Sequence, residues 1–149
     1  MSNIIDKYNV SVPRYTSYPP ANYFHELEAS DYLEAVVRSN EEGTKKLSFY
    51  LHMPFCKRLC HYCGCNSYIM PSSGDTVAKY IDAIHKEIDL VTALIDKSRP
   101  ISQIHFGGGS PTAMPTSVLK EINEHLLSLF PTIEKPEIAI ECHPGYLTE

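Results

Sequence analysis

The sequence lacks any apolar run that approaches the ~18 residues of a membrane span. Its start, MSNIIDKYNV, lacks the apolar segment of a secretory signal peptide. It also lacks an excess of positive charge, since 13 Lys and Arg face 18 Asp and Glu, for a formal net charge of -5. Nucleic acids and anionic membranes favour basic surfaces. We therefore expect a cytoplasmic protein that binds neither nucleic acid nor membrane.

The sequence contains no internal repeat and no low-complexity segment. Hydrophobic residues make up 43% of the chain and charged residues 21%, a composition typical of a packed core. Cysteine is distributed very unevenly, because four of the five cysteines lie within CKRLCHYCGC, residues 56–65. Cytosolic thiols stay reduced, and an odd count suits a disulfide framework poorly. The cluster therefore indicates metal binding or redox chemistry.

Residues 1–45 are interpreted as an N-terminal extension. The stretch PRYTSYPP, residues 13–20, contains three prolines, which favour an extended backbone there. Its arginine and tyrosines could bind an anionic group or a second cofactor, or could hold the extension against the rest of the protein. A short helix over residues 30–39 is predicted to follow.

Periodic apolar residues predict alternating strands and helices after residue 45. In residues 46–53 apolar and polar side chains alternate, which is the periodicity of a strand. A cysteine-rich loop follows directly and ends near Gly74. The remaining predicted elements are a helix over 75–97 with Asp75 as N-cap, a strand over 101–106, a glycine-rich turn, a helix over 117–130 and a strand over 137–142.

This order of elements predicts an α/β fold with parallel strands joined by right-handed crossovers. Chemistry in such sheets gathers at the carboxyl ends of the strands, where the cysteine loop, the glycine turn and Glu141 all fall. Three parallel strands would leave a sheet edge and one sheet face uncovered. We therefore expect a fragment of a longer protein, or a chain that completes its sheet with a partner.

The spacing of the cysteines favours an iron–sulfur cluster over zinc. The pattern is Cys56-x3-Cys60-x2-Cys63-x-Cys65. Structural zinc sites usually use two ligand pairs separated by a longer loop, although zinc with help from His52 or His61 stays possible. Three thiolates at these spacings would leave one iron of a cubane cluster free to bind a small molecule.

Four segments carry a resemblance to a known family: PRYTSYP, FYLHMPFCKRLCHYCGCN, QIHFGGGSPT and EIAIECHP. The Cys-x3-Cys-x2-Cys motif after a first strand resembles the radical S-adenosylmethionine (SAM) enzymes. The four segments together resemble the oxygen-independent coproporphyrinogen III oxidases. The resemblance covers nearly the whole chain but only about the first third of that family's length. It implies that residues 46–149 are the first part of a partial (βα)6 barrel.

The resemblance also implies roles for single residues. It assigns the cluster to Cys56, Cys60 and Cys63, and makes Cys65 a family cysteine that is not a ligand. The residues that it assigns to S-adenosylmethionine are Tyr50, Tyr62, Gly108, Gly109, Ser110 and Glu141. Two positions depart from the family: Ser110 replaces a threonine, and His143 replaces an aspartate. No catalytic side chain is assigned beyond the cluster.

The activity that the resemblance implies is the oxidative decarboxylation of coproporphyrinogen III to protoporphyrinogen IX in anaerobic haem biosynthesis. It implies a [4Fe-4S] cluster, S-adenosylmethionine, a protein that donates or accepts electrons, and a monomeric full-length enzyme. Two alternatives stay open at this point. One is a haem-binding chaperone built on the same cluster domain, and the other is a zinc-binding interaction module.

Overall fold

The computed structural model describes residues 3–9 and 21–146 of the chain, so that PRYTSYPP lies outside the described residues. The chain divides into two units, Met1–Tyr32 and Leu33–Glu149, called here the N-terminal unit and the main unit. The N-terminal unit contains α1 (Ile4–Tyr8) and the short helix η1 (Ala21–Tyr23). The expected boundary at residue 45 stays a prediction.

Helix α2 (Ala29–Glu42) confirms the predicted helix over 30–39 and extends it at both ends. The end of this helix and the residues that follow it are held to residues 94–99, which lie just before the strand that begins at Ile101. The side chain of Asn40 donates to the carbonyl of Leu94 at 2.9 Å, and the buried Arg99 guanidinium donates to the carbonyl of Thr44 at 2.8 Å. These bonds place the end of α2 beside the start of the sheet.

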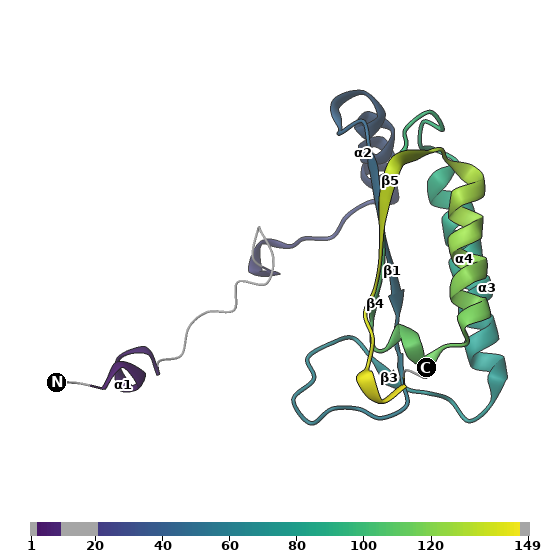
Figure 1. Cartoon of the computed structure of the whole chain (residues 1–149). Coiled ribbons are helices and arrows are strands. Elements are labelled where there is room, and N and C mark those ends of the chain that lie inside the picture. The colour runs from purple at the N-terminus through teal and green to yellow at the C-terminus, as the bar shows by residue number, and fades with distance from the viewer. Residues whose placement is uncertain (1–2, 10–20, 147–149) are drawn as a thin grey trace. The chain divides into compact units, whose positions relative to one another are not determined.

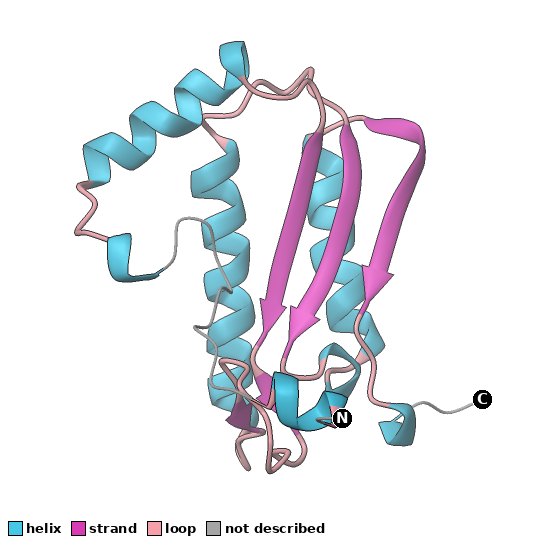
Figure 2. Cartoon of the chain, turned by 90° about the vertical axis from the view of Figure 1, so that its left-hand side faces the viewer, coloured by secondary structure: helices cyan, strands magenta, loops and turns pink. Residues whose placement is uncertain are grey.

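The main unit is built on the predicted parallel sheet. Its strands are β1 (Leu47–Met53), β4 (Ile101–Gly108) and β5 (Thr132–Ile140), in the order β1-β4-β5. Figure 2 shows that all three strands point the same way. Helices α3 (Gly74–Thr92) and α4 (Thr116–Leu129) make the crossovers and cover one face of the sheet (Figure 1). The expected α/β fold is therefore confirmed.

The core lies between this sheet face and the two helices. In β1, Leu47, Leu51 and Met53 are buried and Tyr50 is exposed, as the alternation predicts. Burying one such apolar side chain contributes about 1.5–3 kcal/mol. The side chains with 0% exposure are Met53, Ile101, Ile104, Ile122 and Leu126.

The ends of α3 differ from the prediction. The helix begins at Gly74 with Ser73 at the N-cap position, so that the expected N-cap Asp75 is wrong. Asp75 lies in the first turn instead, where a carboxylate interacts favourably with the helix dipole. The helix ends at Thr92 rather than at residue 97, because the N–H groups of Leu94 and Ile95 bond three residues back, to the carbonyls of Val91 and Thr92, and so leave the α-helical pattern.

Two further features were not predicted. A second small sheet pairs β2 (Phe55–Cys56) with β3 (Tyr68–Ile69) and closes the base of the cysteine loop. Strand β5 begins at Thr132, and its ladder with β4 is irregular before Glu137. That irregularity, on an edge strand of the described sheet, accommodates Pro136. No described helix combines the length and the apolar character that a membrane crossing requires.

Candidate metal and cofactor site

Three loops meet at the carboxyl edge of the sheet, and backbone hydrogen bonds join them. Gly109 N–H donates to the carbonyl of Met53 at 2.8 Å, which ties the glycine turn to the end of β1. Ser110 N–H donates to the carbonyl of Phe55 at 3.1 Å, in the strand that opens the cysteine loop. Glu141 N–H donates to the carbonyl of Phe106 at 2.9 Å. The structure therefore brings together the cysteine loop, the glycine turn and Glu141.

A pocket of about 230 Å³ lies where these loops meet. Its lining contains residues from the cysteine loop, from the glycine turn and from the segment after β5. The sequence-predicted residues among them are Cys56, Cys60, Cys63, Gly109, Ser110 and Glu141. Among the described residues, no three His, Cys, Asp or Glu side chains are already arranged to hold a metal ion. The thiols therefore share a pocket but do not converge on one point.

Several other residues of interest lie in or near this pocket. Cys142, which the sequence suggests is a small buried hydrophobe, is instead exposed and lines the pocket. Cys65 and Tyr62 belong to the cysteine loop but not to the lining, and the Tyr62 side chain is 91% exposed. His143 lines the pocket, and its ring stacks on that of Tyr146 with 4.3 Å between centroids.

Hydrogen bonds and burial separate the pKa values of the thiols. The N–H of Cys65 donates to Sγ of Cys63 at 3.4 Å, and bonds of this kind from Cys65 and Ser67 lower the pKa of Cys63. Burial raises the pKa of Cys56, and the neighbouring Cys63 and Cys60 raise it further. Because the thiolate is the form that binds metal, these opposite shifts in pKa make Cys63 a readier ligand than Cys56.

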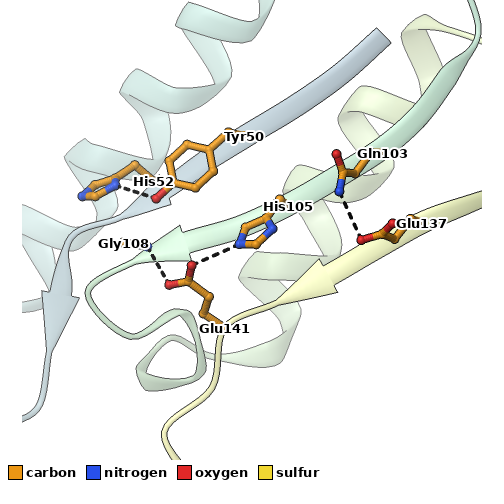
Figure 3. Close-up of polar contacts among 7 residues, drawn as sticks. All are labelled: Tyr50, His52, Gln103, His105, Gly108, Glu137 and Glu141. Atoms are coloured by element: carbon orange, nitrogen blue, oxygen red, sulfur yellow. Dashed lines mark hydrogen bonds and ion pairs between the residues drawn. The ribbon is translucent and has the colours of Figure 1, made fainter. Parts of the chain in front are cut away.

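Tyr50 and His52 lie two residues apart on β1 and contact each other (Figure 3), and His52 also contacts the cysteine loop. His52 Nε2 lies 2.7 Å from the carbonyl oxygen of Asn66, which can only accept, so that Nε2 carries the proton. In the neutral imidazole Nδ1 then accepts from the Tyr50 hydroxyl at 3.1 Å. Burial raises the pKa of Tyr50, and the charges of Glu141 and Cys65 raise it further. The hydroxyl is therefore held in its protonated form.

The Glu141 carboxylate has a donor on each of its oxygens. Oε1 accepts from Nε2 of His105 at 3.1 Å, and Oε2 accepts from the N–H of Gly108 at 3.3 Å (Figure 3). Gly108 has φ +113, a conformation that favours glycine, and a Cβ there would lie 2.8 Å from the His52 ring. A Cβ at Gly107 would lie 2.8 Å from the Tyr50 hydroxyl and 2.9 Å from Oε1 of Glu141. The side chains of Tyr50, His52 and Glu141 therefore lie directly against the backbone of these two glycines.

Sequence reasoning missed Gly107 and His105, and considered His52 only as a possible zinc ligand. All three lie on the sheet face opposite the helices, as do Tyr50 and Gln103, and the parallel register pairs Tyr50 with His105. The signal was present in the sequence, since the alternation of polar residues in QIHFGG continues through the first glycine. We call Tyr50, His52, Gln103, His105 and Glu137 the open face.

A comparison with protein families gives the class to which this arrangement belongs. The model of the radical SAM superfamily matches residues 50–149, which include the cysteine motif, the glycine turn and Glu141. Enzymes of this superfamily use a [4Fe-4S] cluster and S-adenosylmethionine. The match covers more than half of the chain.

Comparisons with individual proteins narrow the class. The chain is 39% identical to an oxygen-independent coproporphyrinogen III oxidase of Synechocystis over 147 residues, which are 98% of this chain and 31% of that protein. It is 37% identical over 142 residues to a protein of the same name from Mannheimia haemolytica, covering 95% of this chain and 94% of that protein. The chain belongs to the radical SAM superfamily and, within it, to the family of the oxygen-independent coproporphyrinogen III oxidases.

A solved structure is similar throughout the chain. Coproporphyrinogen III oxidase (HemN) from Escherichia coli, described as a radical SAM enzyme, matches with a TM-score of 0.79 and 34% identity. The match covers 97% of this chain and 31% of that chain. This chain therefore spans about a third of the length of the first relatives that it matches.

The pocket fits the cofactors that the superfamily uses. It combines three thiols with Gly109. A Cβ at this position would lie 2.9 Å from Sγ of Cys56, so the glycine leaves room beside this thiol. The hydroxyl of Ser110 is buried and, within the described part of the chain, has no hydrogen-bond partner. A buried hydroxyl without a partner costs about 1–3 kcal/mol, so a polar ligand in this pocket would remove the penalty.

Proposed function

We propose that Cys56, Cys60 and Cys63 bind a [4Fe-4S] cluster and that the adjoining surface binds S-adenosylmethionine. The observation that carries this proposal is that all three thiols line the same pocket as Gly109, Ser110 and Glu141. When bound, the cluster supplies the electron that cleaves S-adenosylmethionine. The chain itself contributes binding and orientation of the cofactor.

The roles proposed for the remaining residues are those that the family resemblance implies, and the geometry supports several of them. The backbone at Gly108 and Gly109 allows a ligand to approach closely, because a side chain at either would meet His52 or Cys56. The unpartnered Ser110 hydroxyl is available to the methionyl group, as Glu141 is to the ribose hydroxyls. Two tyrosines, Tyr50 and Tyr62, are proposed to pack against the adenine.

We propose that the activity is the oxidative decarboxylation of two propionate side chains of coproporphyrinogen III to vinyl groups, which yields protoporphyrinogen IX for haem synthesis. The names of the relatives support this substrate. Each decarboxylation releases carbon dioxide and leaves an electron for an acceptor, and we propose an electron-transfer protein for this role. Because this chain spans about a third of the first relatives, most of the substrate contacts are expected outside residues 1–149.

A decarboxylation assay tests this proposal. Reconstituted protein from the natural reading frame, supplied with reductant, S-adenosylmethionine and coproporphyrinogen III under anaerobic conditions, is expected to form protoporphyrinogen IX. Cys60→Ala is expected to form none, because it removes a thiolate from the cluster. Stoichiometric haem binding with no product from the unaltered protein would favour the chaperone alternative instead.

A further inference from the structure

Two polar bridges start from β4 on the open face, one to Glu137 on β5 and one to Glu141 just after β5. Gln103 Nε2 donates to Oε1 of Glu137 at 3.1 Å, and His105 Nε2 donates to Oε1 of Glu141 at 3.1 Å (Figure 3). The donors are two residues apart on β4, whereas the acceptors are four residues apart: Glu137 pairs with Gln103 in the ladder, and Glu141 lies just after the end of β5. The bridges differ in what lies beside them, because only the His105 bridge includes a residue of the pocket.

The orientation of the Glu141 side chain depends on the hydrogen bonds that its carboxylate accepts from β4. Strand β5 ends at Ile140, so Glu141 follows the ladder, and its N–H donates to the carbonyl of Phe106 at 2.9 Å. The carboxylate is about half exposed, at 53%, so packing alone does not fix its orientation. Its two donors, His105 and the N–H of Gly108, both come from β4 and both approach from the sheet side.

The Glu141 carboxylate can accept more hydrogen bonds than the two that it receives from β4. An ionised carboxylate has about four lone-pair sites. Two of these are used by His105 and Gly108, which leaves two for donors from a ligand. A pair of neighbouring hydroxyls, such as those of a ribose, matches this remaining capacity.

The His105 ring is itself held in place. Its centroid lies 5.6 Å from that of Tyr50 with 30° between the ring planes, and its side chain is one-third exposed, at 33%. Nε2 faces a carboxylate oxygen, so this nitrogen carries a proton in both the neutral and the cationic form of the ring. The donor is therefore directed at Glu141 before any ligand arrives.

We infer that His105 is a positioning residue that orients the Glu141 carboxylate for the ribose hydroxyls of S-adenosylmethionine. The inference rests on the proposed function, since it requires that Glu141 binds this cofactor. His105 does not need to touch the cofactor in this role. Its contribution is to donate a hydrogen bond to one oxygen of Glu141 and so to keep the carboxylate plane turned toward the pocket.

Calorimetric titration of S-adenosylmethionine into the anaerobically reconstituted protein, expressed from its natural reading frame, tests the inference. His105→Leu removes the donor, and we expect it to weaken binding about ten-fold. His105→Gln places an amide N–H near the position of Nε2, and we expect it to restore most of that loss. Iron and sulfide contents are expected to be unchanged in both variants, because neither removes a thiol.

Gln103→Leu is the matched control, because it breaks the other polar bridge from the same face of β4, to Glu137, which lies outside the pocket. It is expected to bind S-adenosylmethionine as the unaltered protein does. The inference would be overturned if Gln103→Leu and His105→Leu lost S-adenosylmethionine affinity equally, or if His105→Leu lost none. A loss that His105→Gln fails to restore would overturn it as well.

Glu141→Gln separates failure of the inference from failure of the proposed function. If unaltered protein with a full cluster does not bind S-adenosylmethionine, the proposed function is wrong and the inference falls with it. If Glu141→Gln weakens binding and His105→Leu does not, the inference alone is wrong. The reduced cluster's electron paramagnetic resonance spectrum gives a second readout: addition of S-adenosylmethionine should change it less completely in His105→Leu than in the unaltered protein.

Discussion

Gly109→Ala is a small change with a large expected effect on the cofactor site. A Cβ at this position would lie 2.9 Å from Sγ of Cys56 and 2.9 Å from both the carbonyl carbon and the carbonyl oxygen of Pro54. Two of these atoms belong to the backbone, which cannot move aside as a flexible side chain does. The new methyl group must therefore displace either the turn or the thiol.

The magnitude follows from the cost of overpacking. Inserting a methyl group into a well-packed site typically costs 1–3 kcal/mol, which corresponds to roughly a five- to 150-fold loss in an equilibrium constant. We expect this loss in cluster occupancy or in S-adenosylmethionine affinity, because the displaced atoms belong to the pocket. The backbone conformation is not the cause, since Gly109 does not have a positive φ.

Gly64→Ala provides the matched control within the cysteine loop itself. A Cβ at Gly64 would have no atom within 4 Å outside its immediate neighbours, so this variant should bind iron and S-adenosylmethionine as the unaltered protein does. Iron analysis and calorimetric titration after anaerobic reconstitution compare the two variants. Equal behaviour of Gly109→Ala and the unaltered protein would refute the close packing of the turn against Cys56.

Two further predictions concern stability and association. His125→Leu should lower the free energy of unfolding by about 1–3 kcal/mol, measured by chemical denaturation. The reason is that His125 on α4 bonds to His85 at 2.7 Å and to Asp89 at 2.9 Å, both on α3. An unchanged denaturation midpoint would show that this bridge contributes nothing to stability. The 149-residue chain by itself should associate, since Ile138 and Ile140 are 47% and 45% exposed on an edge strand of the described sheet. A sharp monomeric peak near 16.8 kDa by light scattering would contradict this.

Elements with strong periodicity could be predicted from the sequence. The alternation in β1 and the apolar stripes of α3 and α4 are local patterns, and the structure fully buries the central residues of each: Leu51 and Met53 in β1, Ile81, Ile84 and Ile88 in α3, and Leu119, Ile122 and Leu126 in α4. The pairing of β2 with β3 could not be predicted in this way. Each strand has two residues, and the pair depends on bonds between distant positions, such as that from the N–H of Met70 to the carbonyl of Cys56. The early start of β5 was hidden by Pro136, which disfavours a strand except at an irregular ladder.

The candidate site shows the same division between local and long-range information. The cysteine motif and the glycine turn are local spacings that indicate chemistry without a structure. The bridge from His105 to Glu141 depends on which strands are neighbours and on their register, because the two residues lie 36 positions apart in the sequence. A single sequence does not contain that register explicitly, so His105 could be recognised only once β4 and β5 were placed side by side.

The iron, sulfide and zinc contents of the anaerobically reconstituted protein test the central claim most directly. The account predicts about four iron and four sulfide ions for each chain of unaltered protein and for Cys65→Ala, with no stoichiometric zinc. It predicts loss of the cluster in Cys56→Ala, Cys60→Ala and Cys63→Ala, because each removes the thiolate of one iron. Stoichiometric zinc without sulfide, or full iron content in Cys60→Ala, would contradict it.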